Sequence, residues 1–150
     1  MRKANVSFNI LLPNEDIIDY MEKMRLKAHG YEVVGDPLNT YYGTLLREQR
    51  LLMFAVLLNG TPVAGAYVSN NEHCIYIEHI FVRPEFQRTN FHFGSALIKY
   101  VISKKAAIEQ YYNEELSTIK IEYINESTKH IYENLEFKEG DNPGVLSRGL

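Results

Sequence analysis

The chain has 150 residues, of which 45% are hydrophobic and 23% are charged, and these values are typical of one soluble globular domain. Its net charge of −3 at pH 7 gives no electrostatic reason to expect nucleic acid or an anionic membrane as a partner, and no apolar run is long enough to span a bilayer. The first residues lack the apolar segment of a signal peptide, and the single cysteine, Cys74, cannot form an intramolecular disulfide. We therefore expect a cytoplasmic protein of one domain, residues 1–150, with a buried free thiol.

The first third of the chain predicts one strand and two helices. Residues 6–12 alternate apolar and polar side chains, which indicates a strand. Residues 13–16 form a helix start, apolar side chains follow at helical spacing to Ala28, and Gly30 is a typical residue after a helix end. Residues 31–40 read as a loop, and residues 41–49 as a short second helix.

The middle of the chain predicts three antiparallel strands in a meander. Residues 51–58 are apolar throughout, as in a strand that is covered on both faces. Asn59 and Gly60 form the strongest hairpin signal of the chain and lead into a strand over residues 61–69. A second turn at residues 70–72 precedes a strand over residues 75–82, which is rich in β-branched and aromatic residues.

The last part predicts a long helix and three further strands. Helical spacing runs from Gly94 to Tyr112, and residues 117–124 then alternate as a strand does. A short helix over residues 125–135 is followed by a strand that begins at residues 136–138 and by a final strand over residues 145–150. The predicted class is therefore α/β (α+β), with a mixed, mostly antiparallel sheet of about six or seven strands flanked by about four helices.

The connection between residues 75 and 98 is a candidate anion site. Pro84 ends the strand, a polar loop follows, and a helix begins near Gly94. A helix start presents N–H groups and a positive dipole end, and Arg83 and Arg88 add matching charge. Strand–loop–helix connections also occur in α/β domains that bind no phosphate, so the pattern alone leaves both interpretations open.

The residues of this connection resemble a known motif. The pattern V-x-P-x-x-Q from Val82 to Gln87, a short polar loop and then G-S-A-L-I are similar to the acetyl-CoA-binding motif of the GNAT superfamily of N-acetyltransferases, and the order of predicted elements matches the GNAT fold. In that family the loop usually reads Q/R-x-x-G-x-G/A and cradles the pyrophosphate of coenzyme A. Counting from Gln87 places Asn90 and His92 at the two glycine positions, whereas counting back from the helix places Gly94 at the second.

The resemblance implies a set of cofactor-binding residues in this segment. The first glycine is missing, and Asn90 is a plausible substitute because asparagine tolerates left-handed backbone angles. The implied residues for acetyl-CoA are Phe81, Val82, Gln87, Arg88, Thr89, Asn90, His92, Phe93, Gly94 and Ser95.

A second segment, residues 125–137, resembles the GNAT signature N-x-x-A-x-x-x-Y-E-x-x-G-F. The matching residues are Asn125, Tyr132, Glu133 and Phe137, while Thr128 replaces the usual alanine and Glu136 the usual glycine. The resemblance implies that Tyr132 protonates the departing coenzyme A thiolate and contacts the cofactor, and that Asn125 bonds the pantetheine arm. Alternatively, Tyr132 only packs its helix against the sheet.

The resemblance also implies a general base for the acceptor amine. Glu78 is the candidate, directly or through a water, because it lies where GNAT enzymes often carry an acid. We expect it to share a strand face with Tyr76, Ile80 and Val82, with His79 on the other face as a weaker candidate. An ordinary solvated or ion-paired glutamate is the alternative.

In the family, a bulge in this strand and its divergence from the next one free main-chain N–H groups, here those of Phe81 and Val82, for the acetyl and pantetheine groups. The acceptor is expected between the first two helices, residues 31–42 and the final hairpin. The five histidines show no metal-ligand spacing, so we predict no metal.

The sequence thus predicts an acetyl-CoA-dependent N-acetyltransferase that transfers the acetyl group directly to a primary amine in a ternary complex. We expect a small-molecule or peptide amine as the acceptor, with no nucleic acid or membrane partner, and a homodimer through the C-terminal edge strands stays open. Three alternatives remain: transfer of another acyl group, a GNAT-fold acyl-CoA sensor or interaction module with weak or no catalysis, and an unrelated α/β ligand-binding domain.

Overall fold

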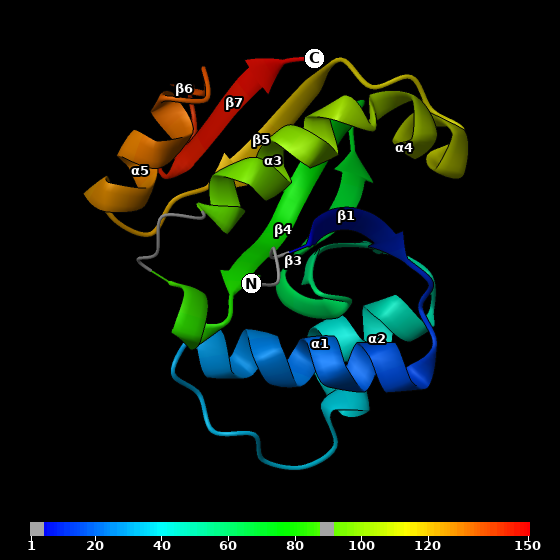
Figure 1. Ribbon diagram of the computed structural model, residues 1–150. Helices are drawn as coiled ribbons and strands as arrows, with labels where there is room; N and C mark the ends of the chain where they lie inside the picture. The colour runs from blue at the N-terminus through cyan, green and yellow to red at the C-terminus, as the bar shows by residue number, and fades with distance from the viewer. Residues whose placement is uncertain (1–4, 88–91) are drawn as a thin grey trace.

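A seven-stranded sheet forms the centre of the computed structural model, which describes residues 5–87 and 92–150 (Figure 1). Its strand order is β1-β2-β3-β4-β5-β7-β6, and only the β4–β5 pair is parallel. The strands are β1 Val6–Leu11, β2 Leu52–Leu58, β3 Thr61–Asn71, β4 Cys74–Val82, β5 Thr118–Glu122, β6 Lys138–Glu139 and β7 Val145–Gly149.

Helices cover both faces of this sheet. The helices are α1 Glu15–Ala28, α2 Tyr41–Arg47, α3 Phe93–Ser103, α4 Lys105–Tyr112 and α5 Glu126–Glu133, with two 3₁₀ turns, η1 Pro37–Asn39 and η2 Pro84–Phe86. In Figure 1, α1 and α2 lie below the sheet, α3 crosses its other side, and α5 lies beside β6 and β7. Within the described residues, no helix has the length and apolar character that a membrane crossing needs.

Two apolar cores explain this arrangement. On one face Ile18, Met21 and Leu46 of α1 and α2 pack with Tyr67 and Phe81 of the sheet. On the other face α3, α4 and α5 supply a larger cluster with the sheet: Leu97, Ile98, Val101, Ile108, Tyr132, Phe54, Val56, Ile75 and Ile119. Strand β2 contributes to both cores, which confirms the prediction that its apolar run is covered on both sides.

The predicted element order is confirmed, with one difference in the long helix. The prediction of a single helix between residues 94 and 112 is wrong, because the helix is interrupted at Lys104 (φ −100°, ψ 21°), which separates α3 from α4. The Ser103 hydroxyl donates to the carbonyl of Tyr100 at 2.6 Å, and the Lys104 N–H turns to Val101 instead. Such side-chain competition for a helical carbonyl is a known cause of helix ends.

The turn predicted at residues 70–72 also lies elsewhere. Asn70 and Asn71 remain in β3, and the two-residue turn is Glu72–His73, both with positive φ (49° and 64°). The Glu114 carboxylate, distant in sequence, accepts hydrogen bonds from the Asn70 amide and from the His73 N–H. A tertiary contact therefore decides which residues turn. The hairpin at Asn59 and Gly60 is confirmed, with φ of 51° and 82°.

Candidate active site

A pocket of about 950 Å³ opens where β4 and β5 separate. The two strands pair in parallel only from Cys74–Thr118 to Ile77–Ile121, although β4 continues to Val82. Within the described residues, this side of β4 beyond Ile77 therefore has no ladder partner, and its main-chain groups are open to a ligand. The predicted site residues that line the pocket are Glu78, Phe81, Val82, Gln87, His92, Phe93, Gly94, Ser95, Asn125 and Tyr132.

A bulge in β4 sets the orientation of the candidate base. Tyr67 of β3 pairs with His79, and the next residue, Val68, pairs with Ile77, so Glu78 is an extra residue in β4. The expected bulge in this strand is thus present.

The bulge shifts the alternation of side chains along β4. Ile77 before it and Ile80 after it both face the α3 side, whereas His79, paired with Tyr67, faces α1 and α2. The Glu78 carboxylate accepts a 2.8 Å bond from the Ser69 hydroxyl on that same α1–α2 face. The prediction that Glu78 shares a face with Ile80 and Val82, opposite His79, is therefore wrong, because the extra residue was invisible in the sequence.

The first turn of α3 forms one side of the pocket. His92 precedes it in the left-handed conformation (φ 50°), and its side chain does not cap the helix. Phe93, Gly94 and Ser95 begin the helix and line the pocket, so N–H groups of a helix start face the cavity. Three predicted loop residues, Arg88, Thr89 and Asn90, lie outside the described residues.

Gln87 lines the pocket, but its side chain is engaged with the protein. Its amide nitrogen donates to the carbonyl of Val82 at 2.8 Å and to that of Ala28 at 3.3 Å. Gln87 therefore ties the end of β4 to the end of α1 and holds the corner of the pocket.

Helix α5 forms the wall next to α3, and its start explains one departure from the family signature. Asn125 caps the helix by accepting a 2.9 Å bond from the Thr128 N–H, and the Asn125 N–H donates in return to the Thr128 hydroxyl oxygen at 3.3 Å. Thr128, in place of alanine, thus completes a capping box. The Asn125 oxygen is used inside the helix, which leaves its amide nitrogen as the group for a ligand.

Tyr132 presents a polar group that the protein leaves unbonded. Its side chain is only 8% exposed, and its hydroxyl has no hydrogen-bond partner within the described residues. Burial raises the pKa of Tyr132 to about 12, so the phenol stays protonated at neutral pH. The ring is buried, but no fully buried side-chain oxygen or nitrogen of the described residues lacks a partner, so the hydroxyl itself opens to the cavity and is free to bond a ligand there.

The residue at the family's glycine position adopts a glycine-like backbone. Glu136 has a φ of 72° in the tight connection between α5 and β6. Its side chain is 80% exposed and lies 3.6 Å from the Arg148 guanidinium. The substitution therefore keeps the turn at the cost of backbone strain.

Aromatic rings from α1, α2 and β4 line the opposite side. The His29 and His79 rings meet edge to face at 4.4 Å between centroids, and the Tyr42 ring contacts His79 at 5.5 Å. Burial, and then the neighbouring His29 and Arg25, lower the pKa of His79 to about 4. His79 is therefore neutral at pH 7. No sequence signal places His29, the residue after the end of α1, in a pocket.

A buried ion pair supports this wall from behind. Arg25 donates to both carboxylate oxygens of Glu22 at 2.7 and 2.9 Å, and the Tyr67 hydroxyl donates to the same carboxylate at 2.7 Å. Thr40, which caps α2, also bonds Glu22, and the Arg25 guanidinium lies 4.8 Å from the centre of the Tyr42 ring. This network was not predicted, although Glu22 and Arg25 fall at helical spacing on the apolar face of α1 in the sequence.

We call the two sides of the pocket the α3–α5 wall (the starts of α3 and α5, Tyr132 and the end of β4) and the α1–α2 wall (His29, Tyr42, Glu78 and His79).

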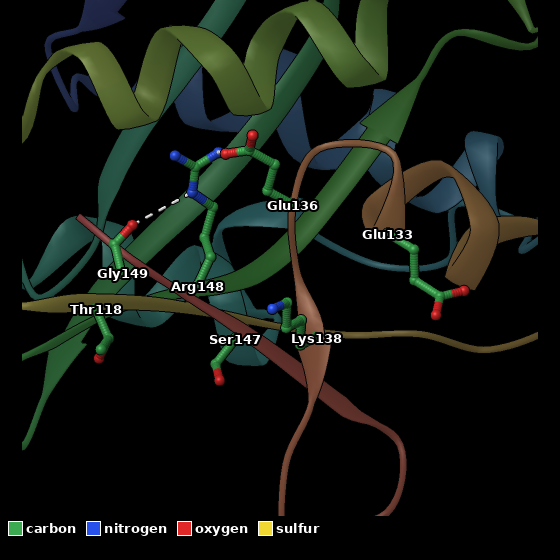
Figure 2. A pocket seen from close by; sticks show the side chains of 7 residues that line it. All are labelled: Thr118, Glu133, Glu136, Lys138, Ser147, Arg148 and Gly149. Atoms are coloured by element: carbon green, nitrogen blue, oxygen red, sulfur yellow. Dashed lines mark hydrogen bonds and ion pairs between the residues drawn. The ribbon is translucent and has the colours of Figure 1, made fainter.

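A second, shallower hollow of about 780 Å³ lies at the β7 edge and contains none of the predicted site residues. Figure 2 shows its arginine, Arg148, turned to the Glu136 carboxylate and the Gly149 carbonyl, and Arg148 also bonds the Leu135 carbonyl at 2.8 Å. This arginine braces the β7 edge.

Cys74 is buried, as predicted, and its sulfur lies 2.7 Å from the Thr118 hydroxyl. Among the described residues, no three His, Cys, Asp or Glu side chains are placed to hold a metal ion.

Comparison with known proteins supplies a family and a fold. The sequence profile of the acetyltransferase (GNAT) family matches residues 16–137. A sequence search of curated proteins finds no match.

Many solved structures share the fold. The ribosomal-protein-S18-alanine N-acetyltransferase from Escherichia coli aligns with a TM-score of 0.69 and 17% identity over 97% of this chain and 94% of its own. The IAA acetyltransferase from Bacillus cereus ATCC 14579 aligns with a TM-score of 0.67 and 16% identity over 97% of this chain and 100% of its own. A structure of AtaTR bound with AcCoA aligns with a TM-score of 0.65 and 14% identity over 96% and 92% of the two chains.

Proposed function

The chain belongs to the acetyltransferase (GNAT) family, and from that membership we propose that it is an acetyl-CoA-dependent N-acetyltransferase that acts on a primary amine by direct transfer in a ternary complex. The single observation that carries this proposal is the pocket at the β4–β5 separation. It brings a carboxylate, a buried phenol and a helix start to one cavity. The expected acceptor is a small-molecule or peptide amine, and the expected location is the cytoplasm.

The residues present fit coenzyme A on the α3–α5 wall. The open edge of β4 at Phe81 and Val82 offers main-chain groups to the acyl and pantetheine parts, and the α3 start at Gly94 and Ser95 offers N–H groups to phosphate oxygens. Acetyl-CoA supplies the acetyl group as a thioester. The crystal structure of AtaTR, which has a similar fold, contains bound AcCoA, and this supports the choice of donor.

The roles of two side chains follow from their chemistry. The Glu78 carboxylate, which keeps one oxygen free of the Ser69 bond, accepts the proton that the acceptor's ammonium group must lose before its nitrogen attacks the thioester, directly or through a water. The Tyr132 phenol holds its proton at neutral pH and donates it from the hydroxyl oxygen to the sulfur that departs.

Binding is the first test of this proposal. Titration calorimetry with acetyl-CoA is expected to give saturable binding that a Gly94→Asp variant weakens by about tenfold, because the added carboxylate repels phosphate at the helix start. A Gly94→Asn variant is the matched control: a Cβ at this position meets no atom within 4 Å, and the amide has nearly the same size without the charge. Equal affinity of the two variants would contradict phosphate binding at α3.

Turnover is the second test. A Glu78→Gln variant is expected to bind acetyl-CoA normally and to release coenzyme A at least about a hundredfold more slowly in the presence of an amine. The engaged Gln87 amide favours the alternative of a sensor with weak or no catalysis, since that side chain is not free for the pyrophosphate. Tight acetyl-CoA binding without turnover on any amine would establish that alternative.

A further inference from the structure

The pocket contains a second carboxylate that the proposed acetyl transfer does not use. Glu122 ends β5 and lines the pocket together with Glu78. Ile77 and Ile121 are the last paired residues of the two parallel strands, so Glu78 and Glu122 are the next residue on each strand, at the point where the strands separate.

The two carboxylates lie on the same face of the sheet. Glu78 bonds Ser69, which lies on the α1–α2 face of β3 with Tyr67, and Glu122 accepts a 2.5 Å bond from the hydroxyl of Tyr76, the direct partner of Ser69 in the register. Like charges at neighbouring cross-strand positions repel each other. Glu78 is half-buried and Glu122 is exposed, so water screens part of this repulsion, and a cation between or beside the two groups would lower it further.

The described protein provides no such cation. The only hydrogen-bond donors to these carboxylates are the neutral hydroxyls of Ser69 and Tyr76, and among the described residues neither glutamate has an ion pair. Each bond uses one carboxylate oxygen and leaves the other. No lysine or arginine occurs among the described residues that line the pocket.

A second feature of the same pocket also indicates a polar ligand. The Tyr132 hydroxyl, on a side chain 8% exposed, lines the cavity without a partner in the described protein. The cavity thus combines a hydroxyl that opens to it with no partner among the described residues and two carboxylates with no ion pair there, while the aromatic rings of Tyr42 and His79 supply an apolar wall beside them.

We propose that the acceptor of this enzyme is a dication, an aliphatic diamine or polyamine whose reacting amine lies at Glu78 and whose second ammonium group is held by Glu122. The inference rests on the proposed acetyl transfer. Glu78 removes a proton from one ammonium group, and Glu122, with Tyr76 as its positioning residue, binds the other in its charged form. An acceptor with a carboxylate at the far end is excluded by repulsion.

Three probes of equal chain length test the second charge. Calorimetry of the protein saturated with coenzyme A should show that 1,4-diaminobutane binds about tenfold more tightly than 1-aminobutane, and that 4-aminobutanoate binds more weakly still. In a Glu122→Gln variant the diamine and the monoamine should bind within about twofold of each other. A Glu115→Gln variant changes the net charge equally at an exposed residue outside the pocket lining, and it should keep the full preference.

The outcomes separate this inference from the proposed function. Equal binding of diamine and monoamine by the wild-type protein, or a preference that survives in Glu122→Gln, would overturn the inference. Rapid acetylation of 1-aminobutane with no gain from a second amine would overturn it too, while leaving the acetyltransferase proposal intact. Selective diamine binding without any acetyl transfer would support the cation site and overturn the acetyltransferase proposal.

Discussion

The two walls of the pocket take their polar groups from different parts of the chain. The α3–α5 wall offers main-chain groups at the open β4 edge and at a helix start, and His92 is the one ionisable side chain other than Tyr132 among its described pocket-lining residues. The α1–α2 wall offers side chains, Glu78, His79, His29 and Tyr42, and a buried ion pair supports it. Backbone groups tolerate substitutions in the side chains around them. Recognition by side chains depends on the identity of each residue and on the contacts that hold its side chain in place.

The largest expected effect follows from breaking the buried ion pair that supports the α1–α2 wall. A Glu22→Ala variant is expected to lose about 3–5 kcal/mol of unfolding free energy, because Arg25 would be left buried without its carboxylate. Urea unfolding measures the change. Asp19→Asn, which removes an exposed pair with Lys23, is the control and should cost less than about 0.5 kcal/mol. A similar small loss in both variants would mean that the network does not support the α1–α2 wall.

The next test concerns the one side chain of the α3–α5 wall with a proposed chemical role. A Tyr132→Phe variant should lower kcat by about a hundredfold and leave acetyl-CoA affinity within about twofold. The phenol donates a proton only below its own pKa of about 12, so the wild-type kcat should not fall with rising pH until about pH 11. Tyr123→Phe, outside the pocket lining, should retain full activity. Unchanged turnover in Tyr132→Phe would mean that Tyr132 only packs its helix against the sheet.

A third test uses the pH dependence of stability to examine His79 of the α1–α2 wall. His79 stays neutral in the folded state to a pKa of about 4, whereas an unfolded histidine binds a proton near pH 6.5. The unfolded state therefore binds more protons between these values, and stability falls as pH drops from about 6.5 to 4.

Replacing His79 should remove part of this loss. Between pH 7 and 4.5, a His79→Phe variant is expected to lose about 2 kcal/mol less unfolding free energy than the wild type. His130→Phe, at a 76% exposed side chain, is the control and should follow the wild-type curve. Parallel curves for all three proteins would show that His79 titrates as an unfolded histidine does.

The smallest expected effect is a gain in stability beside the α3–α5 wall. A Glu136→Gly variant should stabilise the protein by about 0.5–1 kcal/mol, since glycine adopts the φ of 72° without strain and the exposed pair with Arg148 contributes little. Thermal unfolding measures the shift. Glu133→Gly, at the last residue of α5, should instead destabilise the protein by up to about 1 kcal/mol. A loss in Glu136→Gly would show that Glu136 contributes more through its ion pair than the turn costs.

The sequence was sufficient for the elements and for the family. Patterns of two and 3.6 residues, turn residues such as Asn59 and Gly60, and caps such as Asn14 act over a few neighbours, so the strands and helices, apart from the break between α3 and α4, could be predicted from the chain alone. The residues that the two motifs singled out, among them Gly94, Ser95, Asn125 and Tyr132, line one pocket.

Tertiary structure decided the features that depend on residues distant in sequence. The bulge at Glu78 arises from pairing with β3 and reverses the face of the residues that follow it. Glu114 fixed the turn at Glu72 and His73, and the bond from Tyr67 to Glu22, the His29–His79 contact and the presence of Glu78 and Glu122 in one pocket required the assembled sheet and helices. Local patterns record what a residue prefers, whereas the chemistry of this pocket depends on which side chains the fold brings within a few ångströms of one another.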